Sequence, residues 1–401
     1  MPSFSKCVQE MRTSEIRDLM SLATRPEIIS FAGGMPNNDL FPVQEIDDIY
    51  NNLSDREKKI GFQYGPTSGY PPLIESVKEY LRTKNLPVDT NELMITAGSL
   101  QAINIVAKLY VNPGETVVTE NPCFIGGTSA FKSYQADIAS VEMDENGMIM
   151  EQLKSRFADK TKIPRLIYTS PYFHNPAGIV YSEKRKAELL SFLEDKDCVL
   201  IEDDPYNELY FDEESKKLTV SMKTIQPEPV PICYIGSFSK ILGPGMRLGW
   251  LLAQPEIIAK AQLAKQSIDA CSSTFTQVLA NQFLRQGKLK SYVEKLRVIY
   301  ARRMKIMNDS LKKNMPPEIK WVEPRGGFYI WVQLPEKIDA LDIMKESASK
   351  GAIFVIGRTF DPHGIKNNCF RLAFSHTPED QIDNGVKIIA EAVKSKLLFC
   401  E

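Results

Sequence analysis

The sequence predicts an α/β protein that has a large domain and a second, smaller α/β domain. Between residues 93 and 253, short apolar runs alternate with amphipathic stretches, which is typical of a sheet with helical crossovers. Runs such as CYIG are apolar throughout, as expected of strands that helices cover on both faces. The length of 401 residues is also large for a single core, which favours more than one domain.

The elements follow from these patterns in chain order. The predicted strands of the large domain are Leu93–Thr96, Thr116–Glu120, Leu166–Ser170, Cys198–Asp203, Ile232–Ser237 and Leu248–Ala253. Helices are predicted between them at Leu100–Tyr110 and Ser182–Glu194. Beyond residue 253 the predicted helices are Ile257–Gln286, Leu289–Lys313 and a last one near Pro378–Leu398. The smaller layer has the predicted strands Phe328–Gln333, Ile353–Ile356 and Cys369–Phe374.

Composition and charge argue against several classes of protein. The chain has 49 basic and 51 acidic residues without a basic block, which disfavours a nucleic-acid binder, and no apolar run is long enough to span a membrane. Seven scattered cysteines without a CxxC pair predict free thiols in a reducing compartment, and three dispersed histidines predict no metal site. The N-terminal residues lack an apolar signal core and include acidic residues, so we expect a cytoplasmic protein.

The segment from Ser237 to Gly249 carries the strongest chemical signal in the chain. It reads Ser-Phe-Ser-Lys-Ile-Leu-Gly-Pro-Gly-Met-Arg-Leu-Gly and follows the predicted strand CYIG. Ligands of open α/β sheets bind at the carboxyl ends of the strands. Two hydroxyls, the ammonium of Lys240 and the guanidinium of Arg247 at such an edge suit a phosphate and an electrophile. A solvated basic loop is the alternative explanation of Lys240 taken by itself.

Three further motifs each have an ordinary structural explanation when taken singly. Asn-Pro-Ala-Gly, which begins at Asn175, is a turn signal. Asp-Asp-Pro-Tyr at residues 203–206 closes a predicted strand, where an acid can cap the next helix. Arg371 lies in the apolar run CFRLAF, where a single arginine can face water at a sheet edge. The ordered set of all four motifs is far more specific than its parts.

Together these residues resemble the signature of the fold-type I pyridoxal-phosphate (PLP) enzymes, Ser-x-Ser-Lys-x-x-x-Pro-Gly-x-Arg-x-Gly. Its chance occurrence in a chain of this length is on the order of 10⁻⁶ at average residue usage. Over essentially its whole length the chain resembles the class I/II aminotransferases. Within them it is most similar to the branch of kynurenine/2-aminoadipate and multi-substrate aromatic aminotransferases. The segments 30–36, 63–66 and 96–99 support the resemblance.

The resemblance has consequences for the architecture. It implies a large domain with a mostly parallel seven-stranded sheet and a smaller α/β domain. Residues 1–45 would form an N-terminal arm and part of the small domain, residues 46–285 the large PLP-binding domain, and residues 286–401 the C-terminal small domain. Tyr64 resembles a residue that reaches the phosphate from the neighbouring subunit, which implies a homodimer with shared active sites.

The resemblance implies three catalytic residues. Lys240 would hold PLP as a Schiff base and then move a proton between substrate and cofactor, with its pKa lowered by burial and cationic neighbours. Asp203 would pair with the pyridine nitrogen and keep it protonated, so that the ring accepts electrons. Tyr206 would hydrogen-bond the ring oxygen together with Asn175.

Other positions would hold the rest of the cofactor. Phe124 lies where the family has an aromatic side chain that stacks on the ring. The phosphate would lie at a helix N-terminus, where free N–H groups and the helix dipole favour an anion. Its implied contacts are Ser99, Leu100, Ser237, Ser239, Arg247 and Tyr64. Relatives often carry a polar residue at the position of Leu100, where a backbone contact survives but a side-chain contact does not.

The implied substrate contacts come from four residues. Arg371 would bind the α-carboxylate bidentately, with Asn175 beside it and the backbone of Gly34 over the substrate. Arg17 lies in a predicted short helix at Glu15–Leu22. It matches a position that meets a distal carboxylate or an aromatic ring, and a solvent-facing helix arginine explains it equally well.

The implied activity is ping-pong transfer of an amino group to a 2-oxo acid, with 2-oxoglutarate expected. The donor would be an aromatic or long-chain amino acid such as kynurenine, 2-aminoadipate, phenylalanine, tyrosine, methionine or leucine. A PLP-dependent lyase or synthase of the same fold would use the same Lys, Asp and Arg. A PLP-sensing transcriptional regulator would need an N-terminal DNA-binding domain, whereas the first residues here match the aminotransferase arm. An inactive homologue is disfavoured because each chemical position is intact.

Overall fold

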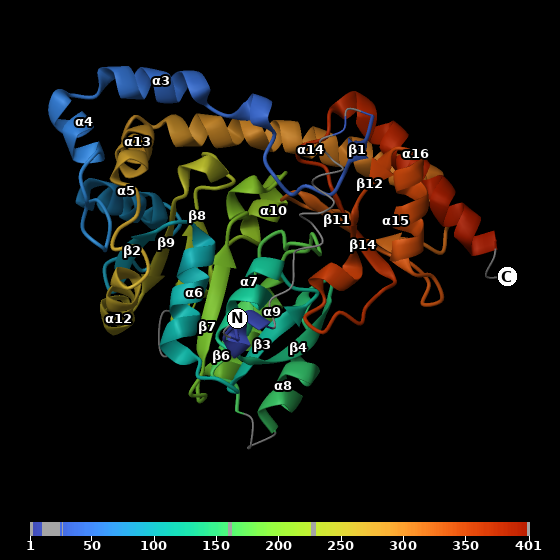
Figure 1. Ribbon diagram of the computed structural model, residues 1–401, viewed down its shortest axis with the longest axis horizontal. Coiled ribbons are helices and arrows are strands. Elements are labelled where there is room, and N and C mark those ends of the chain that lie inside the picture. Colours follow the sequence, from blue (N-terminus) through green and yellow to red (C-terminus); the bar gives the residue numbers. More distant parts are fainter. Residues whose placement is uncertain (1–2, 10–24, 26, 159–162, 226–229, 399–401) are drawn as a thin grey trace.

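The structure is a computed structural model that describes residues 3–9, 25, 27–158, 163–225 and 230–398. The predicted helix at Glu15–Leu22, with Arg17, lies outside the described residues. The first element of the described part is the short helix α1 (Lys6–Gln9). The course of the chain can be followed in Figure 1, where the colours run from the N-terminus to the C-terminus.

The main sheet has eight strands within the described residues, in the order β2-β9-β8-β7-β6-β3-β4-β5. They are β2 (Glu92–Thr96), β3 (Thr116–Asn121), β4 (Asp137–Asp144), β5 (Gly147–Met148), β6 (Leu166–Thr169), β7 (Val199–Asp204), β8 (Ile232–Ser237) and β9 (Gly249–Ala253). The neighbouring pairs from β8 to β4 are parallel, while β9 is antiparallel to both of its neighbours. The expectation of a mostly parallel sheet is confirmed, and the two-residue β5 adds an eighth strand to the expected seven.

Helices cover both faces of this sheet, which explains why its central strands read as apolar runs. One face packs against α6 (Ser99–Tyr110), α7 (Ile125–Ser133) and α12 (Pro255–Gln266). The other packs against α8 (Met150–Ala158), α9 (Glu183–Leu193) and α11 (Met222–Ile225). Every residue of β3, β7, β8 and β9 is buried as a result.

A third group of helices packs near the β2 edge of the sheet. It comprises α3 (Val43–Asn52), α4 (Asp55–Gly61), α5 (Pro71–Arg82) and α13 (Thr274–Arg285). The prediction of one helix over Ile257–Gln286 is wrong, because α12 ends at Gln266 and α13 begins at Thr274. Between them Ala270 has a left-handed backbone, with φ of 59°, and Ser273 caps α13 with its side chain.

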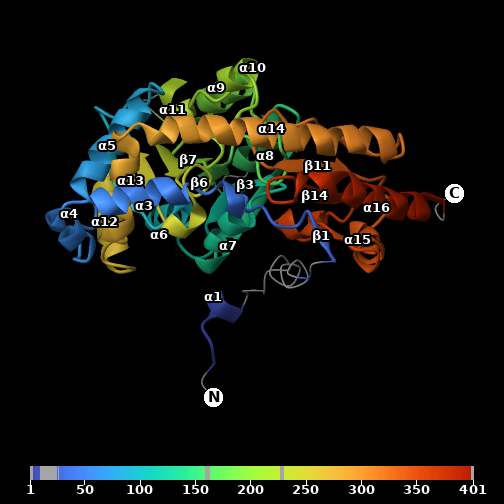
Figure 2. The same ribbon diagram turned by 90° about the horizontal axis from the view of Figure 1, so that it is seen from above.

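The long helix α14 (Lys288–Asn314) joins the two parts of the molecule. Its 27 residues run along the top of Figure 1, from the side of α13 to the side of α15 (Ala340–Ser349) and α16 (Glu379–Leu398). A helix of this length spans about 40 Å. Figure 2 shows the same course from above, with α16 alongside the C-terminal half of α14.

The C-terminal part contains two small sheets. One is four-stranded and antiparallel in the order β10-β11-β14-β13, with β10 (Lys320–Trp321), β11 (Tyr329–Gln333), β13 (Val355–Ile356) and β14 (Cys369–Ala373). The other pairs β1 (Ile29–Ser30) with β12 (Ala352–Ile353) in parallel. This pairing brings the chain that follows β1 against the C-terminal part. The predicted smaller α/β layer is therefore present, while the residue limits given for the domains stay a prediction.

Five short elements complete the described chain. Four are the 3-10 helices η1 (Asn38–Leu40), η2 (Asn207–Leu209), η3 (Pro244–Met246) and η4 (Gly357–Phe360), and the fifth is α10 (Glu213–Lys217). Of these, η2 comes directly after β7, and η3 lies between β8 and β9. Both therefore lie at the strand ends where the chemical motifs are found. None of the described helices is both long and apolar enough to cross a membrane.

Candidate active site

Asp203 lies near the carboxyl end of β7 and is buried, with 2% of its surface exposed. Its Oδ2 accepts a hydrogen bond of 2.7 Å from the hydroxyl of Tyr168. Its Oδ1 is buried and has no hydrogen-bond partner among the residues that the structure describes. Burial raises the pKa of this carboxyl to about 7; the Tyr168 hydrogen bond opposes the rise, and the charges of Asp204 and Glu120 add to it.

Lys240 follows β8, and its side chain reaches the segment that leaves β1. The Nζ atom donates a hydrogen bond of 3.3 Å to the carbonyl oxygen of Gly34. It also lies 5.8 Å from the ring centroids of Tyr206 and Phe328. Burial lowers the pKa of Lys240 to about 8, and the nearby positive charges of Arg371 and Arg247 act in the same direction. A substantial neutral fraction of the amine is therefore available near pH 8.

Two tyrosines meet beside Lys240. The hydroxyl oxygens of Tyr206 and Tyr329 are 2.9 Å apart, and the Tyr329 hydroxyl also donates a longer hydrogen bond of 3.4 Å to the carbonyl of Gly34. A Cβ added at Gly34 would lie 2.0 Å from the Tyr329 hydroxyl oxygen, so this close approach requires glycine. Tyr329 was not among the predicted site residues, although it stands in the middle of them.

Arg371 lies in β14 and is buried, with 2% of its surface exposed. Its Nη1 donates to Oδ1 of Asn175 at 2.8 Å and its Nη2 to the carbonyl of Ala32 at 2.6 Å. Its Nε is buried without a hydrogen-bond partner in the described part of the chain. The guanidinium carbon lies 4.4 Å from the ring centroid of Tyr329 and 4.7 Å from that of Phe360. The two rings hold the guanidinium in place.

The glycine and serine loops meet where β2, β9 and β8 lie side by side. Gly249 pairs with Thr96 on one side and with Ser237 on the other, so the loops leaving these strands are neighbours. A Cβ on Gly249 would lie 2.9 Å from the backbone nitrogen of Ser99, so the close approach of strand and loop requires glycine at this position. Arg247 donates to the carbonyl of Ala97 at 3.0 Å.

Helix α6 begins at this junction with free donors. Its N-cap residue is Gly98, and no side chain in the described residues caps the first turn. The backbone N–H groups of Ser99 and Leu100 therefore remain available to an anion. Nearby, the Ser237 hydroxyl accepts a hydrogen bond of 3.1 Å from the backbone of Ser239.

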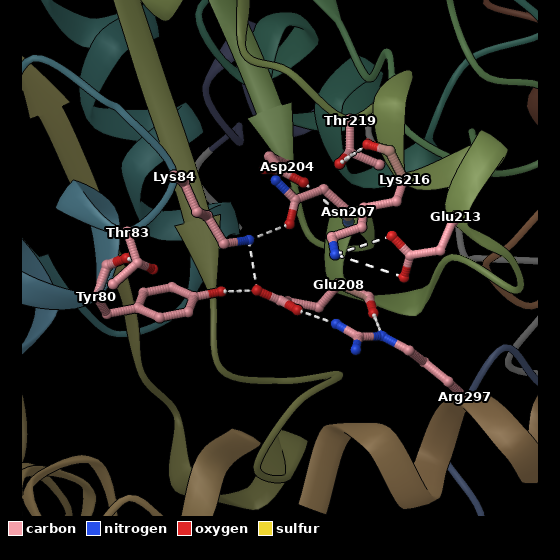
Figure 3. Close-up of polar contacts among 10 residues, drawn as sticks. All are labelled: Tyr80, Thr83, Lys84, Asp204, Asn207, Glu208, Glu213, Lys216, Thr219 and Arg297. Carbon is pink, nitrogen blue, oxygen red and sulfur yellow. Dashed lines mark hydrogen bonds and ion pairs between the residues drawn. The ribbon is translucent and has the colours of Figure 1, made fainter. Parts of the chain in front are cut away.

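A polar cluster anchors the loop after β7, as Figure 3 shows. Lys84 reaches Oδ1 of Asn207 and Oε1 of Glu208, each at 2.5 Å. Arg297 of α14 binds the other carboxylate oxygen of Glu208, also at 2.5 Å. Burial by itself would raise the pKa of Glu208. The nearby cations Lys84 and Arg297 and the hydrogen bond from Tyr80 outweigh burial and lower this pKa to about 2. This cluster connects the loop that carries Tyr206 to the long helix.

The structure brings most of the predicted residues together, while one lies on the surface and one is outside the described residues. Phe124 is partly buried at the N-cap of α7. Tyr64 lies on the surface with 85% of its area exposed. Arg17 lies outside the described residues. In the described ranges, no group of three or more His, Cys, Asp and Glu side chains could hold a metal ion.

Comparison with known proteins decides the family. The sequence profile of the family described as Aminotransferase class I and II matches residues 31–389. The chain belongs to this family. It is 35% identical to aromatic-amino-acid aminotransferase 1 of Thermococcus litoralis over 98% of this chain and 94% of that protein. It is 31% identical to 2-aminoadipate transaminase of Thermus thermophilus, over 98% of this chain and 97% of that protein.

A solved structure agrees with the sequence relatives. The kynurenine aminotransferase of Pyrococcus horikoshii, in complex with PMP, matches this fold with a TM-score of 0.94 at 36% sequence identity. The match covers 98% of this chain and 97% of that one. The predicted family, fold class and enzyme type are therefore confirmed: the chain is a PLP-dependent aminotransferase.

The residues of the site fit PLP on grounds of their own. Oδ1 of Asp203, which has no partner in the part of the chain that the structure describes, suits a protonated pyridine nitrogen, because a buried carboxylate oxygen is costly unless a donor meets it. The uncapped start of α6 suits a phosphate. Sequence reasoning missed Tyr168, Tyr329 and Phe360, since aromatic residues in or near strands are common and their partners come from distant segments.

Proposed function

We propose that this aminotransferase moves an amino group from an aromatic or long-chain amino acid to a 2-oxo acid, with 2-oxoglutarate as acceptor. Kynurenine, 2-aminoadipate, phenylalanine, tyrosine, methionine and leucine are the proposed donors. Relatives named for aromatic amino acids, 2-aminoadipate and kynurenine support this range. The observation that carries the proposal is the buried Arg371, whose Nε has no partner among the described residues and suits the α-carboxylate that all these substrates share.

Nine positions would hold the cofactor by its ring and its phosphate. On the ring side, Asp203 would meet the pyridine nitrogen, Asn175 and Tyr206 the ring oxygen, and Phe124 one ring face. On the phosphate side, the start of α6 at Ser99 and Leu100, the hydroxyls of Ser237 and Ser239, and Arg247 would form the cup. When bound, PLP supplies an electron sink that stabilises negative charge at the substrate Cα.

The substrate would be oriented before any proton moves. Arg371 would bind the α-carboxylate through Nε and its remaining Nη hydrogens, while Asn175 keeps the guanidinium in register. The rings of Tyr329 and Phe360 prevent the guanidinium from tilting. The backbone of Gly34 would close over the substrate and exclude water.

Lys240 would act as the base. Its Nζ, whose pKa burial lowers to about 8, would in its neutral form take the proton from the substrate Cα and hold it for return. The carbonyl of Gly34 accepts a hydrogen bond from this nitrogen, so the amine stays close to the proposed substrate position. Tyr206 would act through a contact with the ring oxygen of the cofactor, and Tyr329, whose hydroxyl meets that of Tyr206, would position it.

We propose a homodimer in the cytoplasm, in which the partner subunit completes each site. Tyr64 is 85% exposed in one protomer, which suits a tyrosine whose contacts lie on a neighbouring subunit. The domain division at residues 45 and 285 belongs to the same proposal. It would place Gly34 with the small domain and Lys240 with the large domain, so that relative motion of the domains closes the site.

Arg17 is proposed to select among side chains by meeting a distal carboxylate or an aromatic ring. Arg17→Ala should raise KM for 2-aminoadipate much more than for leucine, which has no distal charge or ring. Arg371→Ala should weaken all substrates alike because they share the α-carboxylate. Steady-state kcat/KM across 2-aminoadipate, kynurenine, phenylalanine and leucine measures both effects. Equal losses for Arg17→Ala across this panel would contradict its role in selection.

A panel of donors and acceptors tests the function as a whole. Each proposed donor is incubated with 2-oxoglutarate, pyruvate or glyoxylate, and the new amino acid and the new 2-oxo acid are both quantified. Transamination predicts equal amounts of the two products, with 2-oxoglutarate the best acceptor and no turnover in Lys240→Ala. Consumption of donor without any acceptor, continuing well beyond one equivalent per active site, would identify a lyase instead.

A further inference from the structure

Tyr168 lies in β6 and reaches the buried carboxylate of Asp203 from the neighbouring strand. Strands β6 and β7 are parallel, and Tyr168 is paired with Ile201. Asp203 is two residues beyond Ile201 and therefore faces the same side of the sheet. The Tyr168 hydroxyl closes the gap along the strand with a hydrogen bond of 2.7 Å to Asp203 Oδ2.

The ring of Tyr168 has no room to turn. It is completely buried, and it packs edge-on against Phe131 with ring centroids 5.7 Å apart. On another side, a Cβ added at Gly127 would lie 3.1 Å from its Cζ, so helix α7 touches the ring directly. The backbone of α7 and β6 thus fixes the position of the hydroxyl.

This fixed hydroxyl makes the two oxygens of Asp203 unequal. Oδ2 is occupied by the Tyr168 donor, whereas Oδ1 is buried with no partner in residues 27–158, 163–225 and 230–398. A tyrosine hydroxyl can donate one hydrogen bond, and an ionised carboxylate can only accept hydrogen bonds. Removing the donor would free the carboxylate to rotate and would make it more basic.

The charged surroundings make this hydrogen bond important. Asp204 follows Asp203 directly and is itself buried, and the buried Glu120 of β3 is close enough for its charge to act on Asp203. Both carboxylates favour a proton on Asp203, and so does burial. The Tyr168 hydroxyl is the hydrogen-bond donor that opposes them on Asp203.

We propose that Tyr168 is a positioning residue for the amino-transfer reaction. Its hydroxyl holds Asp203 so that Oδ1 faces the pyridine nitrogen of PLP, and it keeps the shared proton on that nitrogen. This inference rests on the proposed role of Asp203 and extends it to a residue that touches neither the cofactor nor the substrate.

The test uses the holoenzyme loaded with PLP labelled with ¹⁵N in the ring. The ¹⁵N signal distinguishes a protonated from an unprotonated pyridine nitrogen without any turnover. In Tyr168→Phe the signal should move toward the unprotonated position. Its kcat should fall about ten- to a hundredfold, the usual effect of losing a hydrogen bond to a charged group. KM for the amino acid should change less than threefold, because Arg371 is untouched.

Tyr234→Phe is the matched control. Tyr234 is also a buried tyrosine, and its hydroxyl donates a 2.6 Å hydrogen bond to Asp204, the next residue of the same strand. This variant loses an equivalent buried hydrogen bond, so it should lose a similar amount of stability. Its ¹⁵N signal should not move toward the unprotonated position, because Asp203 keeps its donor.

The outcomes separate this inference from the proposed function. An unprotonated nitrogen in the wild-type enzyme, or an Asp203→Asn variant that keeps the wild-type signal, would overturn the role of Asp203 itself. A wild-type signal in Tyr168→Phe, with Asp203→Asn shifted, would overturn the role of Tyr168. If Tyr168→Phe does not fold, 4-aminophenylalanine at position 168 keeps the shape with a weaker donor. Its signal should move the same way, and an unmoved signal would overturn the inference.

Discussion

Replacing Gly34 by alanine should disturb the site through Tyr329. The added Cβ would lie 2.0 Å from the Tyr329 hydroxyl oxygen and 2.8 Å from Cε1 and Cζ of the same ring. An ordinary contact is about 3.5 Å or more, so the ring or the Gly34 segment has to move by over an ångström. The ring cannot move freely, because it packs against the guanidinium of Arg371 and its hydroxyl meets that of Tyr206.

The size of the effect follows from these contacts. Forcing an extra methyl group into a packed site costs about 1–3 kcal/mol, and the lost hydrogen bond between the tyrosines adds about 1 kcal/mol. The free energy of unfolding should therefore fall by about 2–4 kcal/mol. A displacement of about 1 Å at substrate-binding groups can cost about a hundredfold in rate. We expect that loss in kcat/KM, mainly through KM, because Arg371 loses the ring beneath it.

Denaturant unfolding of the apoprotein and steady-state kinetics of the holoenzyme measure the two effects. Gly34→Ala combined with Tyr329→Phe removes the atom nearest to the new Cβ and should recover part of the loss. Gly245→Ala is the stability control, because a Cβ there meets nothing within 4 Å in the described structure. Wild-type stability and wild-type KM in Gly34→Ala would refute the argument.

Three further predictions follow from buried charges. Asp203→Asn should keep PLP bound yet lose transamination by several orders of magnitude, whereas Asp204→Asn should mainly lose stability in thermal unfolding; the reverse order would exchange the roles of the two acids. Burial lowers the pKa of Lys240 to about 8, so between pH 8 and 10.5 the unfolded chain binds a proton that the folded apoprotein has released. The free energy of unfolding should therefore rise with pH in that window. Lys240→Met should reduce the slope of this rise by up to the contribution of one bound proton. Glu208→Gln should cost about 3 kcal/mol in urea unfolding, because it leaves Lys84 half-buried without its carboxylate, and a loss below about 0.5 kcal/mol would contradict the buried pair.

The sequence patterns located the central strands well, because helices bury both faces of those strands and leave continuous apolar runs. They missed β4, whose alternating polar and apolar residues are only half buried near the edge of the sheet. The break between α12 and α13 was also missed. It depends on a left-handed Ala270 and on the cap by Ser273, neither of which interrupts the apolar pattern of the two helices.

The candidate site shows the same limit at the level of side chains. Lys240, Asp203 and Arg371 could be named from motifs because their residue types and order are unusual. Tyr168 and Tyr329 carry no such signal, since tyrosine is common in strands. Their importance comes from partners 35 and 123 residues away, which only the folded chain brings within hydrogen-bond distance.

The most direct test of the whole account is the identity of the residue that binds PLP. The purified holoenzyme is reduced with borohydride, digested, and mapped by mass spectrometry for the peptide that carries the cofactor. We expect the cofactor to be fixed to Nζ of Lys240, and Lys240→Ala to yield no labelled peptide while it still binds PLP noncovalently. A labelled peptide that excludes Lys240 would contradict the account.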